Sequence, residues 1–176
     1  MLKKIAENIK NNRNVVEKRE LKPFVELINK NSFKSEKIFS DIGEDSATIK
    51  NKDKYILLTT DRIKTEFVRN FPFGAGFSSI LVGVDDIYCC GGKPLGASII
   101  LSFPDKTNGL KIIEGICEGS KRFQVPIIRG HTNTKDKCYE LSSTMVGEIR
   151  KENYISAKTS KINDILDKAN KRYMFF

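Results

Sequence analysis

The chain has 176 residues, which suits one domain with at most a short appendage. Hydrophobic residues make up 39% and charged residues 30%, so the composition indicates a globular protein, and no apolar run is long enough to cross a bilayer. The lysine-rich N-terminus lacks the apolar core and the cleavage site of a secretory signal, so we expect a cytoplasmic protein without a membrane partner.

The net charge of +9 is concentrated in the two ends of the chain. Residues 1–40 carry ten Lys/Arg and five acids, and residues 150–176 carry seven and three, whereas residues 41–149 carry fourteen of each. Nucleic-acid-binding proteins more often show a basic stripe with aromatic residues on the main body. We therefore interpret the ends as solvated lysine-rich helices and do not expect nucleic acid as a partner.

Hydrophobic periodicity and turn residues predict an order of elements along the chain. The expected helices are residues 2–12, 21–30, 77–90, 108–123 and 161–172. The expected strands are residues 46–50, 54–60, 95–103, 126–130 and 138–149. We expect 95–103 to be a central strand, 126–130 a short buried strand, and the segment with Pro72, Gly74 and Gly76 a loop. This order predicts an α+β fold, a two-layer sandwich in which helices pack on one face of a mixed β-sheet.

Within the helix 108–123, one predicted face is defined by apolar residues at helical spacing. Its members are Leu110, Ile113, Ile116, Cys117 and Ser120. We expect this face to pack on the sheet.

Four polar clusters lie at predicted element ends: IGEDSA (42–47), TTD (59–61), VDDI (84–87) and RGHTN (129–133). Acids at such ends are well placed to hold Mg²⁺ and phosphates, because the backbone there is open. If Glu44, Asp45, Asp61 and Asp86 converged, they would suit Mg-nucleotide chemistry. Each acid alone is equally typical of a turn or a helix cap.

Asp85 and Asp86 are adjacent within an otherwise apolar helical stretch. Neighbouring residues on a helix point about 100° apart, so both cannot face solvent if the helix is mostly buried. A buried carboxylate needs a partner, and we expect at least one of the two to meet a cation, a backbone donor or an arginine. A structural salt bridge remains an alternative to a metal site.

The remaining candidates carry little signal by spacing alone. His131, the single histidine, lies in a predicted loop and is typical of an incidental hydrogen-bonding residue. Gly91 and Gly92 most simply end the preceding helix, and the four cysteines show no metal-binding spacing and are expected to be free thiols. The chain has no Walker sequence, nucleophile elbow or GxGxxG motif.

Taken together and in order, the clusters resemble the N-terminal domain of the AIR synthase-like superfamily. The family pattern is a Gly-Asp-Asp-Ala segment, a Thr-Asp strand end, a Ser-Asp-Ile-Ala-Ala-Met-Gly-Gly-x-Pro helix end and a Gly-Gly-Asp/Glu/His-Thr loop. At similar spacing this chain has GEDSA, TTD, DDIYCCGGKP and RGHT. It looks closest to the AIR synthase-related and methanogenesis-marker branch, and is also similar to thiamine-monophosphate kinase and selenophosphate synthetase.

The resemblance implies a domain that binds ATP and Mg²⁺ and dimerises through its sheet. Carried over by position, it implies cofactor contacts at Glu44, Asp45, Asp61, Asp86, Gly130 and His131. The metal ligands would be Asp45, Asp61 and Asp86, and no catalytic residue is implied. The cysteines at 89 and 90 match small apolar positions of the family and are expected to be packing residues.

The chain departs from the family pattern in three residues and in length. Glu44 replaces an aspartate, Asp85 replaces a serine, and Arg129 replaces a glycine, where it could either obstruct a phosphate or pair with one. Residues 1–155 would form the ATP-binding domain, and 156–176 a linker and terminal helix in place of the family's second domain. The chain would then be half of an ATP-dependent enzyme completed by a separately encoded domain, acting on an unknown small molecule, or a non-catalytic dimerisation module.

Overall fold

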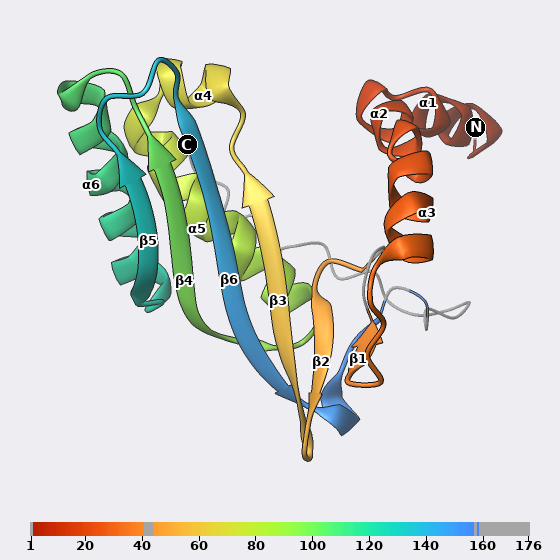
Figure 1. The fold of residues 1–176 in the computed structure, drawn as a ribbon. Helices are drawn as coiled ribbons and strands as arrows, with labels where there is room; N and C mark the ends of the chain where they lie inside the picture. Colours follow the sequence, from red (N-terminus) through yellow and green to blue (C-terminus); the bar gives the residue numbers. More distant parts are fainter. Residues whose placement is uncertain (1, 41–43, 157, 159–176) are drawn as a thin grey trace. The chain divides into compact units, whose positions relative to one another are not determined.

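The structure is a computed structural model that describes residues 2–40, 44–156 and 158 (Figure 1). It divides into two compact units, Met1–Ile38 and Phe39–Phe176, which we describe separately. Within the described residues, no helix has the length and apolar character needed to cross a membrane.

The first unit consists of three short helices, α1 (Leu2–Lys10), α2 (Arg13–Glu20) and α3 (Lys22–Asn31). The predicted helices 2–12 and 21–30 are confirmed as α1 and α3, and a proline lies in the first turn of α3, where a missing N–H is tolerated. Helix α2 was not predicted, because its sequence RNVVEKRE has too few apolar residues to show a helical period.

The second unit is built on a six-stranded mixed sheet with the order β1-β2-β3-β6-β4-β5. Its strands are β1 (Ile38–Ser40), β2 (Ala47–Asn51), β3 (Lys54–Arg62), β4 (Lys93–Ser102), β5 (Ile127–Asn133) and β6 (Glu140–Arg150). The pairs β2–β3, β3–β6 and β6–β4 are antiparallel, whereas β4 and β5 are parallel. The five predicted strands are confirmed, and the short β1 was not predicted.

The helices of the second unit are α4 (Thr65–Asn70), α5 (Pro72–Cys89) and α6 (Lys106–Phe123), followed by the 3₁₀ turn η1 (Lys151–Asn153). Helices α5 and α6 lie against one face of the sheet, which confirms the predicted two-layer α+β arrangement (Figure 1). The predicted loop with Pro72, Gly74 and Gly76 was wrong, because Pro72 begins α5 and both glycines are helical. The predicted helix 161–172 lies outside the described residues.

Two glycines allow α5 and α6 to approach each other at backbone distance. A Cβ atom on Gly76 would lie 2.1 Å from the carbonyl oxygen of Ile112, and one on Gly115 would lie 2.0 Å from that of Phe73. Real Cβ atoms do not approach backbone oxygen this closely, so only glycine fits. Glycine that serves packing looks like a loop signal in sequence, which explains why the start of α5 was missed.

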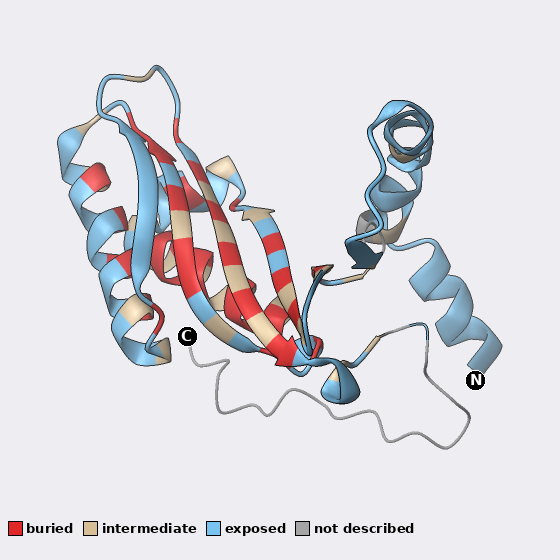
Figure 2. Cartoon of the chain, turned by 60° about the horizontal axis from the view of Figure 1, so that its bottom comes forward, coloured by how far each residue is buried: buried red, intermediate tan, exposed pale blue. Residues whose placement is uncertain are grey.

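Strand residues alternate between a side covered by α5 and α6 and an open side (Figure 2). On β3, Tyr55, Leu57 and Thr59 are buried on the covered side, and Leu58 between them is exposed on the open side. Ile100 of β4 is likewise exposed on the open side, between buried Ile99 and Leu101. The open side therefore carries apolar residues that none of the described helices of the unit covers.

Two predictions about burial were wrong. Strand β5, expected to be buried, is an edge strand on which every residue is exposed. The buried residues of α6 are Gly109, Ile112, Gly115, Ile116 and Gly119, whereas Leu110, Ile113 and Cys117 of the predicted face are exposed. The prediction counted only apolar side chains, and the true packing face is formed largely by glycine.

Replacement of Gly115 by alanine should destabilise the fold, because its methyl group would meet the backbone of α5 and force the helices apart. We expect a loss of about 2 kcal/mol or more in the free energy of unfolding, measured by urea denaturation. Gly74→Ala is the matched control on α5, since its Cβ would meet side-chain atoms at 3.8 Å. That change should stabilise the protein by up to about 1 kcal/mol, and equal destabilisation by both would contradict the glycine-mediated contact.

Candidate functional site

Asp61 and Asp86 come together on the covered side of the sheet, from strand β3 and helix α5. The alternation of β3 places Asp61 on the same side as Thr59, two residues earlier. The Thr59 hydroxyl donates a hydrogen bond to Oδ2 of Asp86, across the layer between strand and helix. The predicted convergence of these two acids is therefore present in the structure.

The pKa of Asp86 shows how much negative charge gathers here. Burial raises this pKa from its usual 3.8 to about 6, while the hydrogen bond from Thr59 opposes the shift. A hydrogen bond with Asp61 and the charges of Asp61 and Asp45 raise it further. We call Asp45, Asp61 and Asp86 the acidic cluster. Because the charges of Asp61 and Asp45 raise the pKa of Asp86, a cation bound beside Asp86 would offset this repulsion.

The segment that carries Glu44 and Asp45 is attached to the end of α5. Ser46 is buried, and its hydroxyl donates to the carbonyl oxygen of Asp86 at 3.3 Å. Burial raises the pKa of the Cys90 thiol, hydrogen bonds with Ser46 lower it, and the charges of Asp45 and Glu44 raise it. The charges of Glu44 and Asp45 therefore raise the pKa of a thiol at the C-terminal end of α5, one helical turn after Asp86. Gly43, which precedes them, lies outside the described residues.

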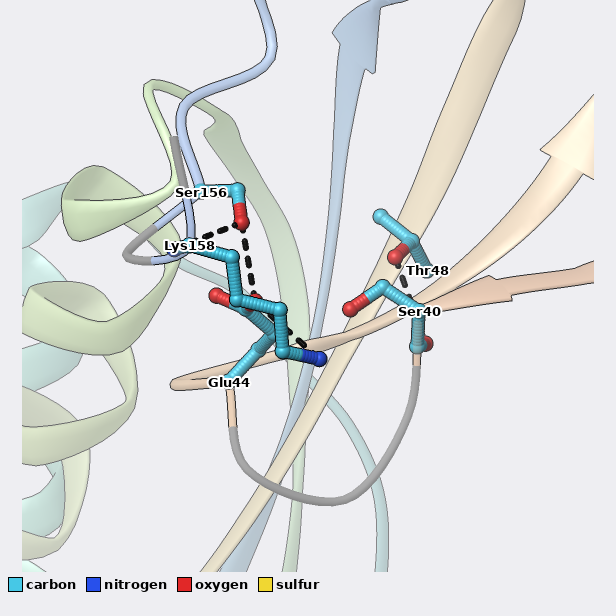
Figure 3. Close-up of polar contacts among 5 residues, drawn as sticks. All are labelled: Ser40, Glu44, Thr48, Ser156 and Lys158. Atoms are coloured by element: carbon cyan, nitrogen blue, oxygen red, sulfur yellow. Dashed lines mark hydrogen bonds and ion pairs between the residues drawn. The ribbon is translucent and has the colours of Figure 1, made fainter. Parts of the chain in front are cut away.

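Glu44 is held by two residues near the C-terminal end of the described chain (Figure 3). Its side chain is only 3% exposed, and its Oε1 accepts a hydrogen bond from the Ser156 hydroxyl at 2.8 Å. The ammonium of Lys158 lies 3.6 Å from the same oxygen. Sequence reasoning did not single out Ser156 or Lys158, because a contact across more than a hundred residues leaves no local pattern.

The adjacent acids Asp85 and Asp86 have different surroundings, as the geometry of a helix requires. Asp85 is exposed and lines a surface hollow of about 390 Å³ with residues of α5 and α6, among them Tyr88 and Arg122. Burial raises the pKa of Asp85 as well. Asp86 accepts a hydrogen bond from the side-chain hydroxyl of Thr59, a donor that the sequence did not single out, and its contact with a cation stays a prediction.

His131 lies on the opposite side of the sheet from the acidic cluster, and Gly130 is separated from Asp61 by the strands β6 and β4. They belong to the exposed edge strand β5, not to a loop as predicted, and His131 pairs with Ile100 of β4. Ile100 faces the open side of the sheet, whereas the acidic cluster is on the covered side. Cys90 is buried as expected for a packing residue, but Cys89 beside it is exposed.

The acidic cluster offers oxygen ligands of the kind that Mg²⁺ prefers. In the described part of the chain, no three or more His, Cys, Asp or Glu side chains form a group that could hold a metal ion, so Asp45, Asp61 and Asp86 do not form such a group by themselves. Magnesium is commonly bound by one or two carboxylates together with water and substrate phosphates. The pair Asp61 and Asp86 fits this incomplete type of site, and Asp45 adds charge close by.

The fold and these sequence clusters define a known family. Residues 43–149 match the family described as AIR synthase related protein, N-terminal domain. The match covers more than half of the chain, and the chain belongs to this family.

Three relatives illustrate the range of the family. An uncharacterised protein of Methanocaldococcus jannaschii is 33% identical over 165 residues, which covers 93% of this chain and 51% of the relative. A phosphoribosylformylglycinamidine cyclo-ligase of Pyrococcus horikoshii is 29% identical, covering 72% and 40%. A thiamine-monophosphate kinase of Pyrococcus abyssi is 35% identical, covering 54% and 33%. The chain thus spans about half, or less, of the length of these relatives.

Two solved structures share the fold. AaThiL complexed with AMPPCP and TMP has a TM-score of 0.65 and 26% identity, covering 78% of this chain and 45% of that one. PurL of T. maritima complexed with ATP has a TM-score of 0.56 and 16% identity, covering 62% and 20%. The second likeness shows the fold alone.

Replacement of Asp86 by asparagine should change how stability depends on pH. Because the pKa of Asp86 is about 6 in the folded protein and 3.8 ordinarily, its ionisation disfavours folding progressively as the pH rises through that interval. Asp86→Asn removes this penalty, so the free energy of unfolding of the variant should rise relative to that of the wild type between about pH 4 and pH 7. Allowing for solvent screening, we expect the gain to reach about 1 kcal/mol in urea denaturation. Asp53→Asn, in the exposed β2–β3 turn, is the control, and parallel pH profiles for Asp86→Asn and wild type would contradict the raised pKa.

Proposed function

We propose that this chain is the ATP- and Mg²⁺-binding domain of an ATP-dependent enzyme that transfers a phosphoryl group or uses ATP to activate a substrate. The observation that carries the proposal is the meeting of Asp61 and Asp86, with the charge of Asp45 nearby, in a domain of this family. The neighbour AaThiL, at 26% identity, is complexed with AMPPCP, an analogue of ATP.

The residues have distinct roles in this proposal. Asp45, Asp61 and Asp86 would hold Mg²⁺, which when bound neutralises charge on the β- and γ-phosphates. Thr59 orients the Asp86 carboxylate toward Asp61 through its hydroxyl, and Ser46 fixes the Asp45 segment against α5. Binding of a cation would also lower the pKa of Asp86, because a nearby positive charge favours the ionised carboxylate.

The substrate and the whole reaction depend on more than this domain. The chain matches about half of the M. jannaschii relative and smaller parts of the cyclo-ligase and the kinase. We propose that a second domain, in the same polypeptide or separately encoded, supplies the rest of the active site. A cytoplasmic location remains our expectation for such an enzyme.

Nucleotide binding is tested by thermal unfolding of the full chain with Mg²⁺ and AMPPCP. At a hundredfold excess over Kd, a ligand stabilises the folded state by about 2.7 kcal/mol, which gives a measurable rise in Tm. Asp61→Asn and Asp86→Asn should abolish this rise. For each variant, the Tm with ligand is compared with the Tm of the same variant without ligand. Asp53→Asn, a carboxylate removed from an exposed turn, should keep it. Absence of any rise for the wild type would refute the proposal.

A second candidate function is a non-catalytic dimerisation module, which the apolar open side of the sheet favours. Leu58, Ile100 and Ile128 are 36%, 47% and 63% exposed there. We propose that a second copy of the chain covers this side, whether or not nucleotide binds. Both candidate functions therefore allow a dimer. They differ in whether the chain binds a nucleotide.

Ile100→Glu should convert the proposed dimer into a monomer, because a carboxylate would be buried against the partner sheet. Sedimentation equilibrium at micromolar concentration measures the change in mass. Ile113→Glu, the same substitution on the exposed face of α6, is the matched control and should leave the mass unchanged. A monomeric wild type would rule out this use of the open side.

A further inference from the structure

The segment formed by residues 154–156 and Lys158 contacts an aromatic cluster, the end of α5 and Glu44. The ring of Tyr154 meets those of Tyr55 and Phe39 edge-on, with centroid distances of 5.4 and 5.8 Å. The backbone N–H of Ile155 donates to the carbonyl oxygen of Cys90 at 3.1 Å. Cys90 follows Asp86 by four residues, a rise of about 6 Å along the helix, so Ile155 is attached about one turn beyond Asp86.

Glu44 is better satisfied by this segment than by a metal ion. A carboxylate that is 3% exposed needs hydrogen-bonding or charged partners, and the hydroxyl of Ser156 and the ammonium of Lys158 both approach its Oε1. The backbone N–H of Lys158 donates in turn to the Ser156 hydroxyl at 3.1 Å, which ties the two residues together. Figure 3 shows Ser156 and Lys158 converging on Glu44.

The ammonium group of Lys158 lies near Glu44, and the rest of its side chain is exposed and can reach a ligand. Its side chain is 68% exposed, and 3.6 Å from Glu44 Oε1 is an ion-pair distance rather than a close hydrogen bond. An ammonium group on a four-carbon stem has three rotatable donors and can contact a second anion without leaving the first. Glu44 directly precedes Asp45, whose Cα is therefore about 3.8 Å from that of Glu44.

A bound triphosphate would need positive charge beside the acidic cluster, and Lys158 can supply it. A triphosphate is strongly anionic, and the acidic cluster of Asp45, Asp61 and Asp86 repels it unless cations intervene. Mg²⁺ would supply part of the positive charge, and a lysine beside the cluster would supply more where it meets the phosphates.

We propose that Lys158 is a phosphate-binding residue of the nucleotide site, and that Glu44 is its positioning residue rather than a metal ligand. The inference rests on the proposed nucleotide function. It also accounts for the glutamate at position 44, because the longer side chain reaches Ser156 and Lys158. Glu44 and Lys158 then act as one unit, and loss of either weakens phosphate binding.

The test is calorimetric titration of the full chain with ATP, ADP and AMP in the presence of Mg²⁺. Lys158→Gln should weaken ATP binding about tenfold, the effect of one lost charge-assisted hydrogen bond, and should leave AMP binding within about twofold. Lys158→Arg should restore most of the ATP affinity, because it keeps the charge. Lys121→Gln, an exposed lysine in the last turn of α6, is the matched control and should bind all three nucleotides as the wild type does.

Glu44→Gln separates positioning from metal binding. It should lower ATP affinity severalfold yet leave the Mg²⁺ concentration needed for half-maximal ATP binding unchanged, whereas Asp86→Asn should raise that concentration. A Glu44→Gln variant that shifts the Mg²⁺ requirement as Asp86→Asn does would overturn the positioning role. Equal ATP affinity for Lys158→Gln and wild type would overturn the inference alone, whereas a wild type that binds no nucleotide overturns the proposed function and the inference with it.

Discussion

The contact between Asp86 and Thr59 joins helix α5 to strand β3 across the covered side of the sheet. It places a carboxylate in a layer filled mainly by apolar side chains such as Leu57, Ile80 and Val84. A helix carrying this group can pack here only if a donor lies opposite and the charge has access to a cation or a proton. The position of α5, and with it the end of the helix where Ser46 and the Glu44 segment attach, depends on that arrangement.

Much of the fold could be predicted because its strands follow simple rules. The strand predicted at 54–60 ends just before Asp61, and the apolar stretch of helical length predicted at 77–90 is the part of α5 that carries Asp86. The start of α5 and the packing face of α6 were missed for one reason. Both depend on glycines, which let the two helices approach closely because they have no side chain. A search for apolar side chains at helical spacing does not detect such positions.

The site was predictable only in part, because some of its residues belong to local sequence motifs and others meet only across a long sequence separation. Asp61 and Asp86 were found from local motifs and a family resemblance, and the structure brings them together. The partners of Glu44 come from residues more than a hundred positions later, and no local spacing identifies them. Glu44, from the first half of the chain, thus meets Ser156 and Lys158 from its last described residues, and only the folded structure reveals that these residues are neighbours.

Strand β5 has a further consequence for how the protein behaves in concentrated solution. As an edge strand it presents unpaired backbone groups, and its neighbouring isoleucines, Ile127 and Ile128, would suit strand-to-strand aggregation. Two features oppose this. The register slips between Ala97 and Ser98, so Ile128 is an extra, bulged residue, and the charged Arg129 follows it directly. Arg129, considered above only as a group that could obstruct or pair with a phosphate, thus lies where natural sheets place a charged residue that opposes aggregation.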